Sequence, residues 1–269
     1  MASSSFFRRL WGRWSWTNGP WTNGTSEDVD PQELNELDQY VWQAAWLNDS
    51  TRRLMIRWSK DFISSKHWEG CNGFRITPEV KKTVALNASL LILAYPTWIF
   101  PSTRTILIYP RPYKARSRGG DLHHGLGGEF YRSGETHARG PVTLNWYDIQ
   151  RALYRDNDGD HLVLHEFSHQ LDMIDDPHAD GLPPLPKGID ADRWKSEFQH
   201  EFLSARDAIA RGEELVINDY GLTHPSEFFA VASECYFQMP WDLREYQPEV
   251  YTLLREFYIT DLAQAMDTP

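Results

Sequence analysis

The feature that most constrains this chain is a His-Glu-x-x-His pattern at residues 165–169. On a helix, four residues advance about 400° and about 6 Å, so His165 and His169 lie one above the other. Two imidazoles placed in this way can bind one Zn²⁺, and Glu166 beside them can polarise a water molecule at the metal. The pattern therefore predicts a catalytic metal centre carried by a helix.

The residues around the pattern predict that it lies on an amphipathic helix. Segment 157–160, Asn-Asp-Gly-Asp, supplies turn and N-cap residues just upstream. The polar face carries the histidines, Glu166 and Asp172, and the apolar stripe consists of Val163, Leu164, Phe167, Leu171 and Ile174. An ordinary amphipathic helix with two surface histidines is the alternative, and the apolar flanks make it the weaker reading.

Length and composition restrict the class of protein. The chain has 269 residues, of which 41% are hydrophobic and 24% charged, as in a soluble globular protein of one large or two small domains. A formal net charge of −11 argues against direct nucleic-acid binding, which needs a basic face. The two cysteines exclude a disulfide framework and suit the reducing cytoplasm, where we expect the protein to act.

Residues 1–30 differ in composition from the rest of the chain. Arginines are interleaved there with phenylalanines and tryptophans, followed by Asn-Gly breakers. We expect a poorly ordered tail, because termini usually fray unless they are tied down. The alternative is an amphipathic helix that associates with a membrane surface.

The remaining periodicities predict an α+β fold that is mainly helical with a small mixed sheet. Apolar residues at helical spacing, and two short apolar runs typical of strands at 104–110 and 140–146, alternate along the chain. The second strand lies about 20 residues before the His-Glu-x-x-His helix. If it is an edge strand near that helix, its unpaired N–H and C=O groups could hold an extended peptide. A purely structural edge strand is the alternative. Segment 111–140 reads as a long excursion or hairpin whose His123 and His124 are surface residues.

A catalytic zinc needs a third protein ligand, for which the chain offers several candidates. Asp175 stands where a metzincin's third ligand would fall, but that motif needs a glycine at the position occupied by Asp172. A carboxylate on the helix that Pro225 opens is the stronger candidate and would give the gluzincin arrangement. Glu227 and Glu234 are two turns apart on that helix, at 225–235. His224 could compete, although Pro225 pushes it toward extended geometry.

Several segments resemble, in sequence and in order, those of the Mlc titration factor A family of bacterial zinc metallopeptidases. The resemblance covers roughly residues 31–260. The matching segments are Gly73-Phe74 with the helix that follows, 105–110, 140–149, the zinc helix ending in Leu171-Asp172, and 220–236. The Arg/Trp-rich tail departs from the family pattern, so residues 31–269 are expected to form the metallopeptidase domain.

The resemblance implies a zincin fold of the gluzincin type. It implies one zinc ion per chain, held by His165, His169 and Glu227, with Glu166 as general base and acid. Tyr220 matches the family's active-site tyrosine. The family is associated with aminopeptidase activity on short peptides, and a characterised member also binds and inactivates the glucose-responsive repressor Mlc.

Two functions are therefore expected. The first is a zinc aminopeptidase acting on a peptide substrate, in which Glu166 passes a proton from the attacking water to the leaving amine while Tyr220 stabilises the oxyanion. The second is a regulatory protein that titrates a repressor, with the peptidase site secondary. Intact Glu166 favours the enzyme, because a pure binding protein could lose it. Asp172 and Glu234 either orient the imidazoles or are solvated.

Overall fold

The computed structural model describes residues 29–93, 100–116, 129–132, 134, 136, 140–153, 159–175 and 177–267. The predicted tail lies outside these ranges except for its last two residues. His123 and His124 lie outside them as well.

The N-terminal part of the described chain is helical. Its elements are α2 (Pro31–Glu36), η2 (Leu37–Gln39), η3 (Trp42–Trp46), α3 (Asp49–Ser65) and α4 (Pro78–Leu90). Helix α4 begins at Pro78, a residue suited to the first helical position, and the Val80 N–H donates to the side chain of the N-cap residue Thr77 at 3.3 Å.

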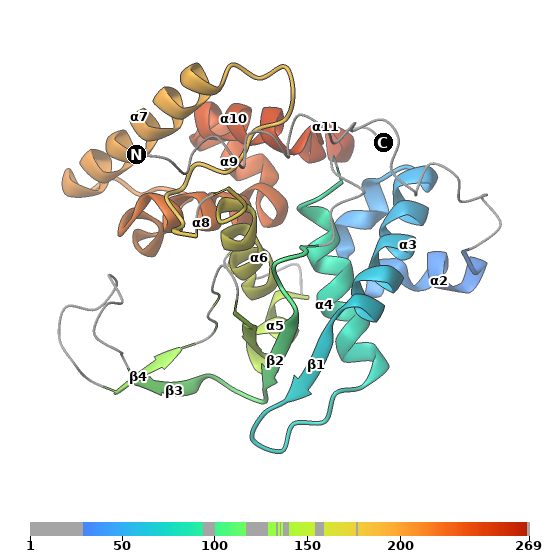
Figure 1. The fold of residues 1–269 in the computed structure, drawn as a ribbon. Helices are drawn as coiled ribbons and strands as arrows, with labels where there is room; N and C mark the ends of the chain where they lie inside the picture. The colour runs from blue at the N-terminus through green and yellow to red at the C-terminus, as the bar shows by residue number, and fades with distance from the viewer. Residues whose placement is uncertain are drawn as a thin grey trace, which may run out of the picture.

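The central sheet has three strands in the order β1-β2-β5, namely β1 (His67–Gly70), β2 (Thr105–Tyr109) and β5 (Val142–Asn145). Both pairings are parallel, so the expectation of a mixed sheet is wrong for the described strands. The physical reason is the connection between the strands. In the sequence α4 follows β1 and precedes β2, and a helical crossover of this kind returns the chain to the same end of the sheet (Figure 1). Antiparallel pairing occurs in a separate hairpin, β3 (Tyr113–Arg116) with β4 (Glu129–Arg132).

The predicted edge strand is confirmed among the described strands. β5 pairs with β2 on one side and packs against α6 (Leu162–Asp172). The other helices of this half are α5 (Trp146–Ala152), α7 (Ala191–Ala210), η4 (Asp219–Leu222), α8 (Pro225–Gln238), α9 (Pro240–Tyr246), α10 (Pro248–Tyr258) and α11 (Leu262–Asp267). Figure 1 shows α6 near the centre, between the sheet and the group formed by α7 to α10.

Helix α6 is held in the core by its apolar face. Val163, Leu164 and Phe167 are fully buried, and the Phe167 ring lies 5.6 Å from Phe62 and 4.8 Å from Phe100 between ring centroids. Such edge-to-face contacts add to the free energy of burying the rings. The opposite, polar face of α6 is thereby turned toward α8, which packs directly against it.

The N-cap of α6 differs from the one that the sequence indicates. His161 caps the helix, with its Nδ1 accepting from the Leu164 N–H at 3.3 Å, whereas segment 157–160 was expected to supply the cap. Its Nε2 lies 2.9 Å from Asn87 Oδ1 on α4. Burial lowers the pKa of His161 to about 4, so the imidazole is neutral and Nδ1 can accept. His161 takes the cap position in place of segment 157–160 because Asn87, a buried residue far away in the sequence, holds its side chain.

In the described part of the chain, none of the helices combines the length and the apolar character that crossing a membrane requires.

Candidate metal centre

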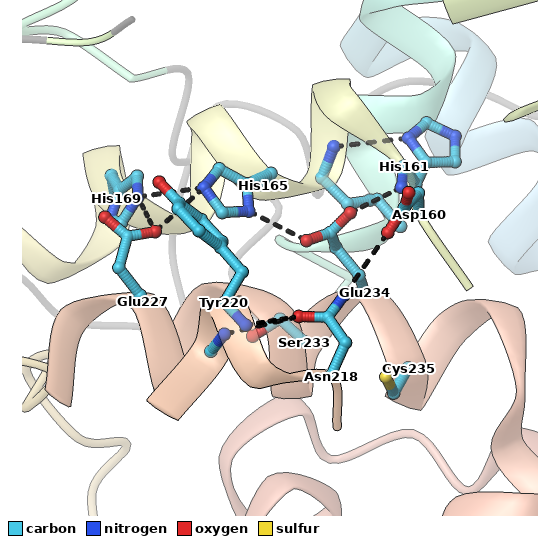
Figure 2. Close-up of polar contacts among 12 residues, drawn as sticks. Asp160, His161, His165, His169, Asn218, Tyr220, Glu227, Ser233, Glu234 and Cys235 are labelled. Carbon is cyan, nitrogen blue, oxygen red and sulfur yellow. Dashed lines mark hydrogen bonds and ion pairs between the residues drawn. The ribbon is translucent and has the colours of Figure 1, made fainter. Parts of the chain in front are cut away.

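Two helices bring three potential metal ligands together. His165 and His169 lie on the face of α6 that looks toward α8, and Glu227 projects from the first turns of α8 (Figure 2). The two Nε2 atoms are 3.2 Å apart, and Glu227 Oε2 lies 3.1 Å from the first and 3.4 Å from the second. Three donor atoms from distant parts of the sequence therefore surround one point.

These separations fit a zinc ion. Bonds of about 2.0–2.1 Å in tetrahedral geometry place neighbouring ligand atoms about 3.3–3.4 Å apart. Two imidazoles and one carboxylate are also the ligand set of catalytic zinc sites, in which the fourth position stays open for water or substrate. The group His165, His169 and Glu227 could thus hold one such ion without rearrangement.

Glu234 fixes the orientation of the His165 ring. One of its carboxylate oxygens lies 2.7 Å from His165 Nδ1, and the other accepts from the backbone N–H of His161. An imidazole that donates through Nδ1 presents the lone pair of Nε2 to the centre, which is the tautomer that a metal needs. The sequence left open whether Glu234 orients an imidazole or is solvated. In the structure it is buried and contacts the His165 imidazole.

The electrostatics of the group favour a cation. Burial lowers the pKa of His165, but the charges and hydrogen bonds of Glu234 and Glu227 raise it more, so that it lies well above its usual value. Burial raises the pKa of Glu227, but hydrogen bonds from His165 and His169 outweigh it, and the pKa falls far below its usual value. Glu227 is therefore ionised although it is almost fully buried. Buried carboxylates of this kind require a compensating positive charge.

Within the described part of the chain, Asp172 is neither bonded to an imidazole nor solvated, the two roles left open for it by the sequence. Its carboxylate accepts the backbone N–H groups of Gly181 and Leu182 at 2.8 and 3.0 Å. Gly181 has a φ of +80°, and a Cβ there would lie 2.3 Å from the Pro225 carbonyl oxygen, so the loop packs closely on the first turn of α8. Asp172 thus ties the end of α6 to the loop that packs on the start of α8 and supports both helices of the site.

Glu166 and Tyr220 lie beside the group. Glu166 is 5% exposed, and the Tyr220 ring centroid on η4 is 5.8 Å from that of His165. Burial raises the pKa of the Tyr220 phenol, and the negative charges of Glu227 and Glu166 raise it further. The phenol therefore remains protonated and can donate a hydrogen bond. Its hydroxyl end points toward the group of potential ligands (Figure 2).

The other candidates for a third ligand stand apart from the group. Asp175 follows the end of α6, and among the described residues it does not belong to the group of potential ligands formed by His165, His169 and Glu227. His224 is the N-cap of α8, where its Nδ1 accepts from the Ser226 N–H at 3.2 Å. The sequence analysis did not identify His161 as the N-cap of α6 and a partner of Glu234. Its position one turn before His165 was the only signal that pointed to it.

The chain matches a known protein family over most of its length. Residues 15–259 match the family described as glucose-regulated metallo-peptidase M90. The chain belongs to this family. The match to the M90 family begins inside the segment interpreted as a tail and spans the whole candidate centre.

Individual relatives of this chain also support its membership of the M90 family. An uncharacterised protein of Synechocystis sp. is 35% identical over 199 residues, which cover 73% of this chain and 72% of the relative. Mlc titration factor A of Edwardsiella ictaluri is 30% identical over 247 residues, 86% of this chain and 91% of the relative. The protein of that name from Yersinia pestis (strain Pestoides F) is 30% identical over 218 residues, 80% of each chain. The family resemblance inferred from the sequence is confirmed.

The M90 family is a family of metallopeptidases, so membership implies that the protein uses a metal ion. The group formed by His165, His169 and Glu227 is a site for such an ion that the described residues provide.

We expect Glu234→Gln to weaken zinc affinity by about 10–100-fold, because partners that orient metal-bound imidazoles typically contribute that much. Competition with a chromophoric chelator measures the change. Glu214→Gln, at an exposed position, is the matched control and should bind zinc like the unchanged protein. Equal affinities in the two variants would mean that Glu234 does not act through His165.

Proposed function

We propose that this protein is a zinc-dependent metallopeptidase with His165, His169 and Glu227 as ligands and Glu166 as general base. The observation that carries the proposal is the convergence of two Nε2 atoms and one carboxylate oxygen at separations of 3.1, 3.2 and 3.4 Å. Glu166 adjoins His165 on the same helix and is buried beside the centre. The family resemblance favours aminopeptidase action on short peptides.

The chain's own residues would divide the chemistry as follows. A bound zinc ion supplies a Lewis acid that polarises the peptide carbonyl and lowers the pKa of water toward 7. Glu166 takes the proton of the attacking water and delivers it to the leaving amine. Although Tyr220 is 49% exposed, desolvation of its phenol and its acidic neighbours raise the pKa, so the hydroxyl stays protonated and can donate a hydrogen bond to the oxyanion.

Strand β5 is suited to hold the substrate. It lies at an edge of the described sheet and packs against α6, the helix that carries His165 and His169. A peptide added to this edge would be held in extended form by main-chain hydrogen bonds.

We further propose that residues 31–269 form the catalytic domain and act in the cytoplasm. Cys71 and Cys235 are both free thiols, which supports a reducing compartment.

Glu166→Gln should keep zinc and fold but lose most of its turnover, because an amide cannot accept the proton of water. General acid–base catalysis contributes about 10²–10⁴-fold, so kcat should fall to a hundredth or less. Hydrolysis of amino-acid p-nitroanilides and short peptides measures kcat, with zinc content and melting temperature as checks. Glu249→Gln, exposed on α10, is the control. Turnover above about a tenth of the unchanged value would assign the base elsewhere.

A second function is binding of a transcriptional repressor. Two relatives are named Mlc titration factor A, and the family resemblance implies binding of the repressor Mlc, so both favour this function. Such binding would not need the general base, so the two functions can be separated by one variant.

We expect the Glu166→Gln variant to bind a purified Mlc-type repressor with the same affinity as the unchanged protein, because the substitution leaves the surface and the zinc ligands in place. Analytical ultracentrifugation or calorimetry measures the affinity. Absence of complex formation by the unchanged protein at micromolar concentrations would remove the regulatory function for that repressor and leave the peptidase proposal standing.

A further inference from the structure

The backbone at Gly134 lies directly against the carboxylate of Glu166. A Cβ built on Gly134 would be 2.2 Å from Glu166 Oε1 and 2.7 Å from its Cδ, well inside any normal contact distance. It would also be 2.7 Å from Leu162 Cδ1, one turn earlier on α6. A side chain at this position would push the ends of the Glu166 and Leu162 side chains aside, so the glycine lets Glu166 keep its position.

The chain near Gly134 is fastened to the same helix. Gln170 lies one turn after Glu166 on α6 and is 1% exposed. Its Nε2 donates to Thr136 Oγ1 at 2.5 Å, and its Oε1 accepts from Thr103 Oγ1 at 2.6 Å. The Thr103 contact fixes the amide, and the Thr136 contact holds the chain two residues beyond Gly134.

Glu166 follows His165 directly on α6, so its side chain leaves the helix beside the candidate centre. It is 5% exposed. The Gly134 backbone closes one side of the carboxylate. A glutamate side chain has three rotatable bonds, and a neighbour in contact with its end excludes the rotamers that would occupy the same space.

We propose that Gly134 is a positioning residue for Glu166: its backbone, held on α6 through Thr136 and Gln170, confines the carboxylate to the side of the metal centre. The inference rests on the proposed function in that Glu166 is the base, and it adds the part of the chain that keeps this base in place. A base held in its working geometry before substrate arrives loses no rate to reorientation.

A double-mutant cycle on stability tests the contact without turnover. Gly134→Ala is made in the unchanged protein and in a Glu166→Ala background, and urea unfolding is followed in the presence of a chelator. The backbone cost and the Leu162 contact are the same in both backgrounds and cancel. We expect Gly134→Ala to lower the folding equilibrium constant at least fivefold more when Glu166 is present. Equal penalties in the two backgrounds would overturn the proposal.

A kinetic cycle tests the positioning role. Gln170→Leu removes the amide and its hydrogen bonds with Thr136, Thr103 and Ser102 and puts a somewhat shorter apolar side chain in its place. Gln150→Leu at an exposed position of α5 is the control. We expect kcat to fall about tenfold for Gln170→Leu with KM and zinc content unchanged, and to fall no further in the Glu166→Gln background, where the base is already lost. A loss of the same factor in both backgrounds would show a general structural role and overturn the proposal.

The two cycles also separate this inference from the proposed function. An unchanged protein that holds zinc but hydrolyses no peptide would contradict the peptidase proposal. The stability cycle would in that case still show by its coupling whether Gly134 confines Glu166.

Discussion

The packing of α6 against α8 is the interaction on which the candidate centre depends. Each helix contributes only some of the potential ligand atoms, so neither could form the site alone. Each also buries acidic or basic side chains at the contact, where Glu227 and Glu234 are about 5% exposed. Charges removed from water to this degree cost several kcal/mol each unless they are paired. The imidazole of His165 meets both carboxylates, and a divalent cation would complete the balance. The apolar faces that carry Phe167 and Phe228 into the core hold the helices together in spite of that cost.

Supports outside the ligand group keep this contact in one geometry. His161 caps α6 and, through its backbone N–H, binds the Glu234 oxygen that does not face His165. Asp172 closes the other end of α6 onto the loop that packs against the first turn of α8. Helix α6 is therefore fixed at both ends by hydrogen bonds that reach α8 or the loop packed against it. Rigid placement of this kind is what a site with positional tolerances of about 0.5 Å needs.

Local signals in the sequence predicted the elements that carry the site. The spacing of His165 and His169, the apolar stripe of α6, and Pro225 at the start of α8 are all short-range features, and the helices formed where these signals placed them. The choice of Glu227 over Asp175 was harder, because it depends on which chain segment returns to α6. The parallel sheet, the cap at His161 and the Gly134 contact were not predicted, since each is decided by residues that meet only in the folded chain.

X-ray absorption at the zinc edge tests the central claim, that His165, His169 and Glu227 hold one zinc ion, most directly. The account predicts close to one zinc per chain, with two imidazole nitrogens and carboxylate or water oxygens at about 2.0–2.2 Å and no sulfur at about 2.3 Å. In Glu227→Ala the two imidazoles should remain and one oxygen should be lost or replaced by solvent, with weaker retention of the metal. A spectrum with a sulfur shell, or one without imidazole scattering, would place the zinc elsewhere and contradict the account.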